Sequence, residues 1–386
     1  MRSYFEFPGR KAKLSNSRVL IMAGGTGGHI FPGLALAAEL QARGVSVEWL
    51  GTRRGLESRL VRDAGIALHF IDIEGVRGRG PAALLKAPFL VLMAIIQAAK
   101  VIRQFNPAVI VGLGGFVAGP GGAAAKLLGR PLVIHEQNAI AGTTNKLLSR
   151  IADRVLSAFP NVFAKAEVIG NPVRREIAEI SEPKTRFSAS PDQLNVLVLG
   201  GSRGARAINQ LMPEALSKVF SLSATQCAAK ISVLHQTGDA LVDETLEAYN
   251  LHKIELGDQV QVTAFVDDMA AKLTWANLVI CRSGALTVSE LAAAGVASLL
   301  VPFPYAIDDH QTVNGQFLVG AGAAKMWQQS ELSADTLAAQ IIEFSERPEA
   351  LLQMAEHARA EAKPEATARF ADVCQTFIVS ELVGKV

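Results

Sequence analysis

The chain alternates short runs of apolar, β-favouring residues with longer segments in which apolar residues recur at helical spacing. In the first half, strands are predicted at residues 18–22, 45–50, 68–71, 108–112 and 132–135. Helices are predicted at residues 32–43, 56–64, 81–105 (with a break or kink at Pro88) and 119–128. This alternation is typical of parallel sheets that are covered by helices on both faces.

The same alternation resumes after residues 171–192, where three prolines and several charges interrupt the pattern. Strands are then predicted at residues 195–199, 231–235, 261–264, 278–281 and 298–301. Helices are predicted at residues 205–219, 239–250, 285–294 and 334–343, and from residue 366 onward. With 386 residues, the chain is long enough for two domains. We therefore expect an α/β protein of two doubly wound, Rossmann-like domains with a deep cleft between them.

The pattern also predicts where these domains begin and end. We expect a disordered extension at residues 1–17, a first domain at 18–175, a linker at 176–192 and a second domain at 193–365. The extension lacks the apolar core of a signal peptide. The most apolar stretch, residues 87–99, has 13 uncharged residues, fewer than the roughly 20 that span a bilayer. We therefore expect that the chain does not cross a membrane.

One phrase of the sequence occurs twice. Residues 19–29 read VLIMAGGTGGH and residues 196–206 read VLVLGGSRGAR, each an apolar run that ends in a glycine-rich turn before a predicted helix. Such turns leave backbone N–H groups uncovered at a helix start, where a phosphate or sugar can bind. Ligands of doubly wound domains bind at the carboxyl ends of the strands, which is where these turns fall.

Charge divides the chain into unlike halves, although its formal net charge is only +2. Residues 1–175 carry 23 Lys and Arg against 10 Asp and Glu, whereas residues 176–386 carry 15 against 26. The split indicates that the first half meets an anionic partner: a polyanion, an anionic membrane or a phosphorylated substrate. The three scattered cysteines suit neither a disulfide framework nor a metal site, and they favour a reducing compartment.

Candidate chemistry in the first half lies at three strand ends. The GGTGGH turn is not a Walker loop, because no Gly-Lys-Ser/Thr follows it at the required spacing. It is not a dinucleotide fingerprint either, because Ile30 stands where the third glycine would be. His29 closes this turn at a helix start, where the helix dipole favours a neutral imidazole, and it is either a base or a structural histidine. GLGGFVAGPGG (residues 112–122) is either a pyrophosphate nest or a packing corner. HEQN (residues 135–138) brings four polar side chains to a strand end, which favours a site.

In the second half, CRSGALTVSELAAAG (residues 281–295) is the most informative stretch. The N–H groups of Leu286 and Thr287 in the first helical turn can hold a phosphate. Glu290, one turn further on, can accept two hydrogen bonds from a ribose diol, or it is simply an exposed helix residue. Residues 264–269 offer backbone groups to a base edge, and the loop at 301–315 carries polar side chains suited to sugar hydroxyls: Asp309, His310, Gln311 and Asn314.

These motifs, taken in order, resemble the MurG family of peripheral membrane glycosyltransferases. The resemblance rests on GGTGGHIFPGLALA, GLGGFVAGPGG, HEQN, GNPVR, GGSRGAR, CRSGALTVSE and DDHQTVN, and it runs from about Arg18 to the C-terminal helix. It implies a GT-B fold whose N-terminal domain faces the membrane and the acceptor, and whose C-terminal domain holds a UDP-sugar. It also implies that the last helix, residues 366–386, packs back on the N-terminal domain.

The resemblance and the chemistry of the residues together assign roles to particular positions. His29 is the expected catalytic base and Glu136 a weaker candidate. The residues expected at the donor are Thr26, Gly27, Gly28, Asn138, Arg174, Ser202, Val266, Leu286, Thr287, Glu290, His310 and Gln311. Gly25, Gly114 and Gly115 are expected at the acceptor pyrophosphate. Arg203 and Phe116 depart from the Gln and Tyr that the family often has, so the amide and hydroxyl roles do not carry over.

The resemblance implies an inverting transfer of N-acetylglucosamine from UDP-N-acetylglucosamine to the 4-hydroxyl of undecaprenyl-pyrophosphoryl-N-acetylmuramyl-pentapeptide (lipid I to lipid II). This step serves peptidoglycan synthesis and hence cell shape and division. We expect no cofactor and no nucleic-acid partner. We also expect no bound metal, since no Asp-x-Asp motif is apparent. We expect a cytoplasmic enzyme, peripheral on the inner face of the inner membrane, with cell-wall synthesis proteins as candidate partners. The alternatives are another GT-B enzyme, such as a lipid glycosyltransferase or an epimerase, and a non-catalytic UDP-sugar-binding protein.

Membrane docking is expected through a basic and apolar segment of the first half. Its residues are Arg77, Arg79, Leu84, Leu85, Lys86, Phe89 and Leu92. The alternative is that this helix belongs to the core.

Overall fold

The computed structural model describes residues 17–73, 81–189, 193–201, 204–226 and 230–383. Its contacts group the chain into two compact units. The first unit holds the chain up to His135, Gly142–Leu156 and the stretch from Thr367 onward, and the second holds Glu136–Ala141 and Ser157–Ala366. Residues 157–175, which the sequence pattern kept with the first domain, are thus grouped with the second.

A seven-stranded sheet has the strand order β3-β2-β1-β4-β5-β6-β7. Its strands are β1 (Arg18–Ala23), β2 (Ser46–Gly51), β3 (Ala67–Phe70), β4 (Val109–Gly114), β5 (Leu132–Glu136), β6 (Arg154–Ser157) and β7 (Glu167–Val168). Strands β1 to β6 lie in the first unit, apart from Glu136 and Ser157, whereas β7 belongs to the residues grouped with the second unit. The pairings from β3 to β5 are parallel. Strand β1 lies between β2 and β4, so the chain reverses its winding direction there and creates a topological switch point.

Helices cover both faces of this sheet. They are α1 (Gly27–Ala42), α2 (Glu57–Asp63), α3 (Pro81–Phe105), α4 (Gly115–Leu127), α5 (Thr143–Leu148) and α15 (Ala366–Val383). One buried core joins strand residues such as Leu20, Ile110 and Ile134 to α3, α4 and α5. Helices α1 and α4 begin at Gly27 and Gly115, earlier than the predicted starts at residues 32 and 119.

Helix α3 corrects the length argument made from the sequence. Residues Ala87–Phe105 lie in one continuous helix that is long and apolar enough to cross a membrane, the only such helix among the described residues. The sequence argument counted only the uncharged residues 87–99, whereas the apolar part of the helix continues past Lys100 to Phe105, so the count underestimated its length. The carboxyl half nevertheless packs into the core of the first unit, where Ala94, Ala98, Val101, Ile102 and Phe105 are buried. A buried core helix passes the same test of length and composition.

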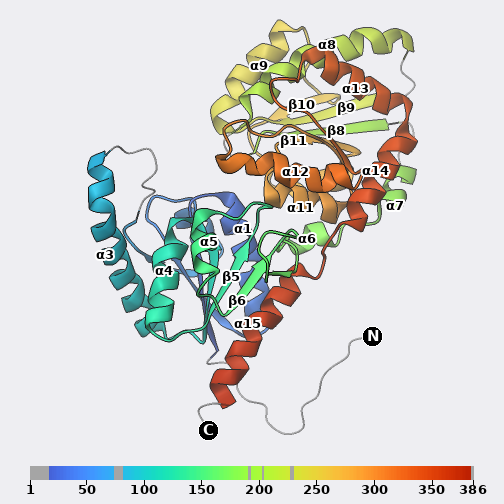
Figure 1. Cartoon of the computed structure of the whole chain (residues 1–386). Helices are drawn as coiled ribbons and strands as arrows, with labels where there is room; N and C mark the ends of the chain where they lie inside the picture. Colours follow the sequence, from blue (N-terminus) through green and yellow to red (C-terminus); the bar gives the residue numbers. More distant parts are fainter. Residues whose placement is uncertain (1–16, 74–80, 190–192, 202–203, 227–229, 384–386) are drawn as a thin grey trace. The chain divides into compact units, whose positions relative to one another are not determined.

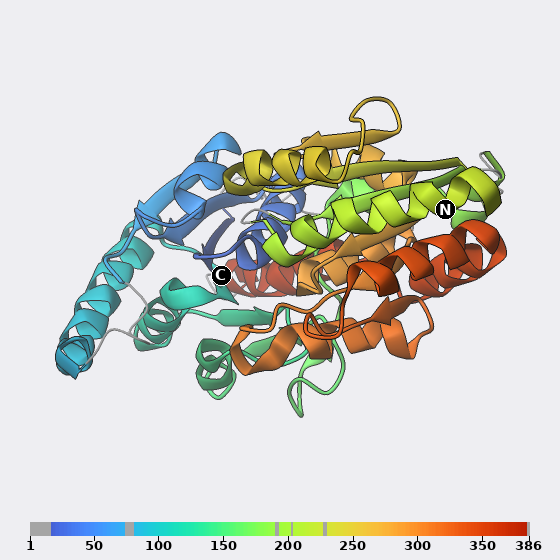
Figure 2. The ribbon, with the colours of Figure 1, turned by 90° about the horizontal axis from the view of Figure 1, so that it is seen from above.

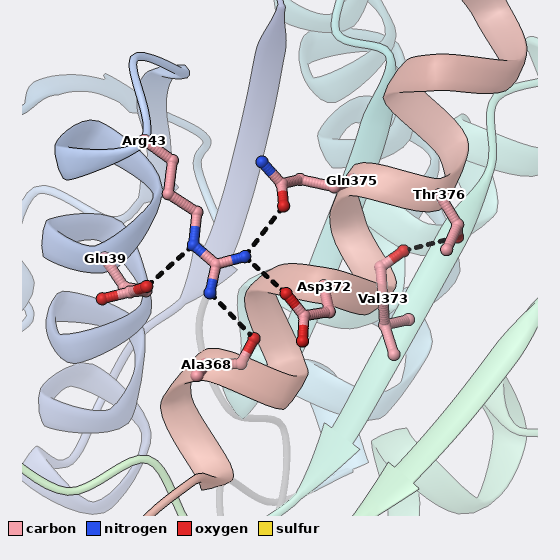
Figure 3. Close-up of polar contacts among 7 residues, drawn as sticks. All are labelled: Glu39, Arg43, Ala368, Asp372, Val373, Gln375 and Thr376. Carbon is pink, nitrogen blue, oxygen red and sulfur yellow. Dashed lines mark hydrogen bonds and ion pairs between the residues drawn. The ribbon is translucent and has the colours of Figure 1, made fainter. Parts of the chain in front are cut away.

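Helix α15 belongs to the first unit although it ends the described chain (Figure 1). Arg43, just after α1, donates to Asp372 at 2.6 Å, to Gln375 at 2.8 Å and to the Ala368 carbonyl at 3.3 Å (Figure 3). The Phe370 ring stacks on His135 of β5 with their ring centroids 5.2 Å apart. The last helix is thus held to the first unit by an arginine and an aromatic contact.

The second unit contains a six-stranded sheet with the order β10-β9-β8-β11-β12-β13. Its strands are β8 (Gln193–Leu199), β9 (Lys230–Gln236), β10 (Val260–Thr263), β11 (Leu278–Cys281), β12 (Ala297–Leu300) and β13 (Ala324–Met326). All five pairings are parallel. Strand β8 lies between β9 and β11, which places a second topological switch point here, equivalent to that of β1.

Alternate residues of these strands face two separate cores. Val196 and Val198 of β8 pack beneath α8 (Arg206–Gln226), α9 (Val242–Leu251) and α13 (Ala334–Glu346). Leu197 and Leu199 face α10 (Met269–Trp275), α11 (Ala285–Ala294) and α12 (His310–Gly320). Helices α8 and α13 lie side by side over the sheet (Figures 1 and 2). Two α/β units with parallel, doubly covered sheets confirm the predicted fold class.

The predicted linker contains two short helices and packs against the second unit. These are α6 (Arg175–Ala178) and α7 (Pro183–Ala189). Arg186 of α7 donates to the carbonyls of Leu273 at 3.2 Å and Ala294 at 2.8 Å, and thereby caps the carboxyl end of α11. Arg359 of α14 (Pro348–Ala360) donates to the neighbouring Ala293 carbonyl. Two guanidinium groups therefore neutralise the negative end of α11.

Candidate active site

In the first unit, two glycine turns meet at the switch point of the sheet. One joins β1 to α1 and the other joins β4 to α4. Gly114 and Gly115 have φ angles of 108° and 77°, which favour glycine. A Cβ atom on Gly115 would lie 2.4 Å from the Gly24 carbonyl oxygen, and one on Gly114 would lie 2.9 Å from Cε1 of His29. The structure therefore brings together His29 and all three glycines predicted for the acceptor, Gly25 included.

Helix α1 begins within the first of these turns. Thr26 is the extended N-cap residue, and no side-chain hydrogen bond caps this helix. The His29 N–H donates to the Thr26 carbonyl at 3.1 Å. The N–H groups of Gly27 and Gly28 precede the first intrahelical bonds, so they can serve a ligand at the positive end of the helix.

In the second unit, α11 begins directly after β11 and offers the other helix start. Gly284 is its N-cap residue and supplies no capping side chain. At the start of the helix, the Val288 N–H donates to the Gly284 carbonyl at 2.9 Å. The N–H groups of Leu286 and Thr287 therefore lie in the first turn, where an anion is favoured.

Glu290 lies one turn further along α11 and is paired with Arg174. The guanidinium of Arg174 donates to Oε1 of Glu290 through Nη2 at 2.9 Å and Nε at 3.3 Å. Burial raises the pKa of Glu290, while the charge of Arg174 and its hydrogen bonds oppose that rise. The side chain of Glu290 is 13 % exposed and that of Arg174 is 38 % exposed. The structure thus joins two predicted donor residues that lie 116 positions apart.

The remaining donor candidates of the second unit lie at other strand ends. Val266 follows β10 and is nearly buried, whereas its neighbour Phe265 is 59 % exposed. His310 and Gln311 open α12, and Oε1 of Gln311 accepts the Phe303 N–H at 3.0 Å. Ser202 and Arg203 lie outside the described residues. Among the residues that the structure describes, no His, Cys, Asp and Glu side chains gather in a group of three or more that could hold a metal ion.

The end of the HEQN motif is tied to the second unit, not to the first. Oε1 of Glu136 accepts the backbone N–H and the side-chain amide of Asn138 at 3.0 and 3.1 Å. Oδ1 of Asn314 accepts the Ala139 N–H at 2.8 Å. Asn171 donates to the Gln137 carbonyl at 3.1 Å and to Ser289 of α11 at 3.0 Å. Contacts from α11 and α12 therefore fix the loop that carries Glu136 and Asn138.

Comparison with known proteins identifies the chain. Residues 19–157 match the glycosyltransferase family 28 N-terminal domain, and residues 195–370 match the glycosyltransferase family 28 C-terminal domain. The chain belongs to glycosyltransferase family 28. It is also 49 % identical over 366 residues, 93 % of this chain and 92 % of the relative, to a curated protein of Saccharophagus degradans. That relative is named UDP-N-acetylglucosamine–N-acetylmuramyl-(pentapeptide) pyrophosphoryl-undecaprenol N-acetylglucosamine transferase.

Solved structures agree with this family 28 assignment. The crystal structure of Acinetobacter baumannii MurG is 42 % identical with a TM-score of 0.79, covering 93 % of this chain and 99 % of that one. A putative UDP-N-acetylglucosamine 2-epimerase from Listeria monocytogenes is 16 % identical with a TM-score of 0.61, covering 92 % and 94 %. At that identity the epimerase shows only that the fold is shared. The predicted membership and the predicted class of enzyme, a glycosyltransferase, are confirmed.

Two residues of this family 28 chain carry contacts that the sequence did not reveal. Glu57 is fully buried and accepts the Gly25 N–H at 3.1 Å. Asn171 was read only as part of the GNPVR motif, yet it bridges the loop at Gln137 to α11. Asn314, predicted to read sugar hydroxyls, is instead fully buried and holds the loop at Ala139. The available sequence signal was position: Glu57 lies two residues after Gly55, and Asn171 lies between Gly170 and Pro172.

Proposed function

We propose that this chain transfers N-acetylglucosamine from UDP-N-acetylglucosamine to the 4-hydroxyl of a lipid-linked N-acetylmuramyl-pentapeptide. One observation supports a donor-binding site in the second unit: Arg174 and Glu290 form an ion pair close to the start of α11, where Leu286 and Thr287 lie. A carboxylate can accept from a ribose diol, and helix N–H groups together with an arginine suit a diphosphate. The near-full-length likeness to curated transferases of that name supports the choice of sugar and acceptor.

The proposed chemistry is a single displacement. His29 takes the proton of the acceptor hydroxyl, the oxygen bonds to C1 of the sugar, and the C1–O bond to UDP breaks on the opposite face. The α-linked donor then gives a β(1→4) product. The N–H groups of Leu286 and Thr287 stabilise the charge that develops on the leaving diphosphate. Glu136 is the weaker base, since it is buried and its Oε1 already accepts two hydrogen bonds from Asn138.

The deciding experiment supplies labelled UDP-N-acetylglucosamine with three acceptors: the lipid-linked muramyl-pentapeptide, the free sugar and the free lipid. We expect label to move only to the complete acceptor. Conversion of the donor without any acceptor would indicate an epimerase instead. UDP binding without any turnover would indicate a sensor.

His29 is tested separately. In a His29→Ala variant that folds and binds UDP as the wild type does, we expect kcat to fall by about 10²–10⁴-fold. A kcat near that of the wild type would reject His29 as the base and leave the transfer reaction itself intact.

We further propose that the amino half of α3 docks on the inner face of the cell membrane. Its exposed apolar residues are Phe89, Leu90, Val91, Leu92, Met93 and Ile96. Arg77 and Arg79 lie outside the described residues, as do the side chains of Leu84, Leu85 and Lys86. Exposed apolar patches of this kind are typical of interaction sites.

Vesicle binding tests this docking. Burying Phe89 and Leu92 contributes about 2–3 kcal/mol together, so replacing both by Ser weakens binding to anionic vesicles by roughly 30- to 160-fold. Leu251→Ser is the matched control, because Leu251 is exposed on the second unit. Equal binding by the double variant and the control would reject docking through α3.

A further inference from the structure

We propose that Glu57 is a positioning residue for the transfer reaction, because its carboxylate fixes the glycine turn that carries Thr26 and His29. This inference rests on the proposed role of His29. Glu57 does not belong to any of the motifs that suggested the function. It lies in the first turn of α2, after β2.

The carboxylate of Glu57 is fully buried and joins two separate strand ends. Oε2 accepts the backbone N–H of Gly25 at 3.1 Å. Oε1 accepts the backbone N–H of Thr52 at 2.9 Å and its hydroxyl at 2.7 Å. Glu57 thus bridges the turn after β1 to the end of β2, across 32 residues of sequence.

Three glycines shape the space around this side chain. A Cβ atom on Gly24 or on Gly51 would lie 2.7 Å from an atom of Glu57, and one on Gly55 would lie 2.0 Å from Oε2. A side chain at any of these positions would displace the Glu57 side chain from its present place. The turn at Gly24 can approach the carboxylate closely only because it lacks a side chain.

The contacts continue from Glu57 to the imidazole. Gly24 and Gly25 lead directly into Thr26, the N-cap of α1, and His29 lies in the first turn of that helix. On the other side, the Gly24 carbonyl packs against Gly115 and His29 packs against Gly114. A shift of the turn at Gly25 would therefore move the imidazole relative to the second glycine turn.

The chemistry requires a carboxylate at this place. All three partner groups are donors, and they approach both oxygens of Glu57. Among the described residues, no ion pair includes Glu57, so these hydrogen bonds compensate its burial. A glutamine of the same size has one acceptor oxygen. If that oxygen faces the two donors of Thr52, its –NH₂ group faces the Gly25 N–H and repels the turn.

The test compares Glu57→Gln with the matched control Thr52→Val in the labelled-sugar assay. For Glu57→Gln we expect kcat to fall by about 30-fold, because small misplacements of a catalytic group cost up to 10²-fold. The Kd for UDP should stay within about twofold, since the proposed nucleotide contacts Arg174 and Glu290 belong to the second unit. The predicted donor residues Thr26, Gly27 and Gly28 follow the displaced turn, so the KM for the sugar donor is not used as the control. Thr52→Val keeps the Gly25 bond and should retain kcat within about threefold.

A double variant separates positioning from a general loss of stability. If Glu57 acts through His29, adding Glu57→Gln to His29→Ala should lower kcat by less than about threefold further. Multiplied effects of the two changes would overturn the inference, as would a wild-type kcat in Glu57→Gln. Absence of transfer by the wild-type protein would instead refute the proposed function.

The inference stays testable if Glu57→Gln does not fold. Glu57→Asp keeps the charge but withdraws the carboxylate by one methylene, so it cannot reach both Gly25 and Thr52 at hydrogen-bond distance. We expect the same loss of kcat with unchanged UDP binding. A wild-type kcat in folded Glu57→Asp would overturn the inference.

Discussion

Replacement of Arg43 by methionine should release α15 from the first unit. The arginine side chain is 22 % exposed, and it makes three of its hydrogen bonds to α15 (Figure 3). A buried hydrogen bond to a charged group contributes about 1.5–3 kcal/mol, but Asp372 is 65 % exposed and its share is smaller. We therefore estimate a total of about 2 kcal/mol for the contacts of Arg43 with this helix.

Cys374 reports the opening of α15. It is fully buried in this helix, and burial raises the pKa of its thiol to about 12, so labelling requires the helix to open. A loss of about 2 kcal/mol corresponds to roughly 30-fold faster labelling in Arg43→Met. Cys281, buried in the second unit with its pKa also raised to about 12 by burial, serves as the internal reference. Cys227, outside the described residues, is replaced by Ser in every protein compared.

Arg175→Met is the matched control for this experiment. Its ion pair with Glu179, the residue that follows α6, is largely exposed, so we expect no change in the labelling of Cys374. An acceleration of less than threefold in Arg43→Met, or an equal acceleration of Cys281, would refute the argument that Arg43 holds α15 in place.

Two further predictions concern the second unit. Glu290→Gln should weaken UDP binding by roughly 10- to 30-fold in calorimetry, because a charged acceptor for the ribose is lost. Glu179→Gln is the control, and an unchanged affinity of Glu290→Gln for UDP would reject the ribose role. Burial lowers the pKa of His235 to about 3, below its ordinary value near 6.5. The unfolded chain therefore binds a proton that the folded unit excludes, and stability falls as the pH drops below about 6.5, by up to about 1.4 kcal/mol per pH unit. Urea unfolding between pH 7 and 5 should show a shallower pH dependence in His235→Gln, and equal slopes would contradict the assignment.

The hydrophobic pattern predicted the ten strands that matter most for the fold. Strands β7 and β13 were not predicted, because runs of two and three residues are too short to show periodicity. Strand β6 was not predicted either, and its two apolar residues lie between the polar residues Arg154 and Ser157. The start of α4 was placed too late because glycine has a low helix propensity. Burial of Val117 and Ala118 against the core overrides that preference.

The candidate site was predictable only where its residues are neighbours in sequence. The glycine turns and the start of α11 are local features, and motifs revealed them. Contacts such as Asn171 with Ser289 join positions 118 residues apart, and no local pattern records which polar side chain will find which partner. Glu57 lies in the predicted helix at residues 56–64 and in none of the motifs, and no local pattern indicates that it is fully buried.

The return of α15 to the first unit has a consequence for how the protein is made. Asp372 leaves the ribosome 329 residues after Arg43, which at about 5–20 residues per second is a delay of roughly 20 to 60 s. During that time the nascent first unit lacks the helix that covers His135. The second unit, whose chain is enclosed between parts of the first, can complete its sheet earlier. We therefore expect translation speed and nascent-chain chaperones to act mainly on the first unit. Its first strands are synthesised before the second unit, and its last helix is synthesised after it.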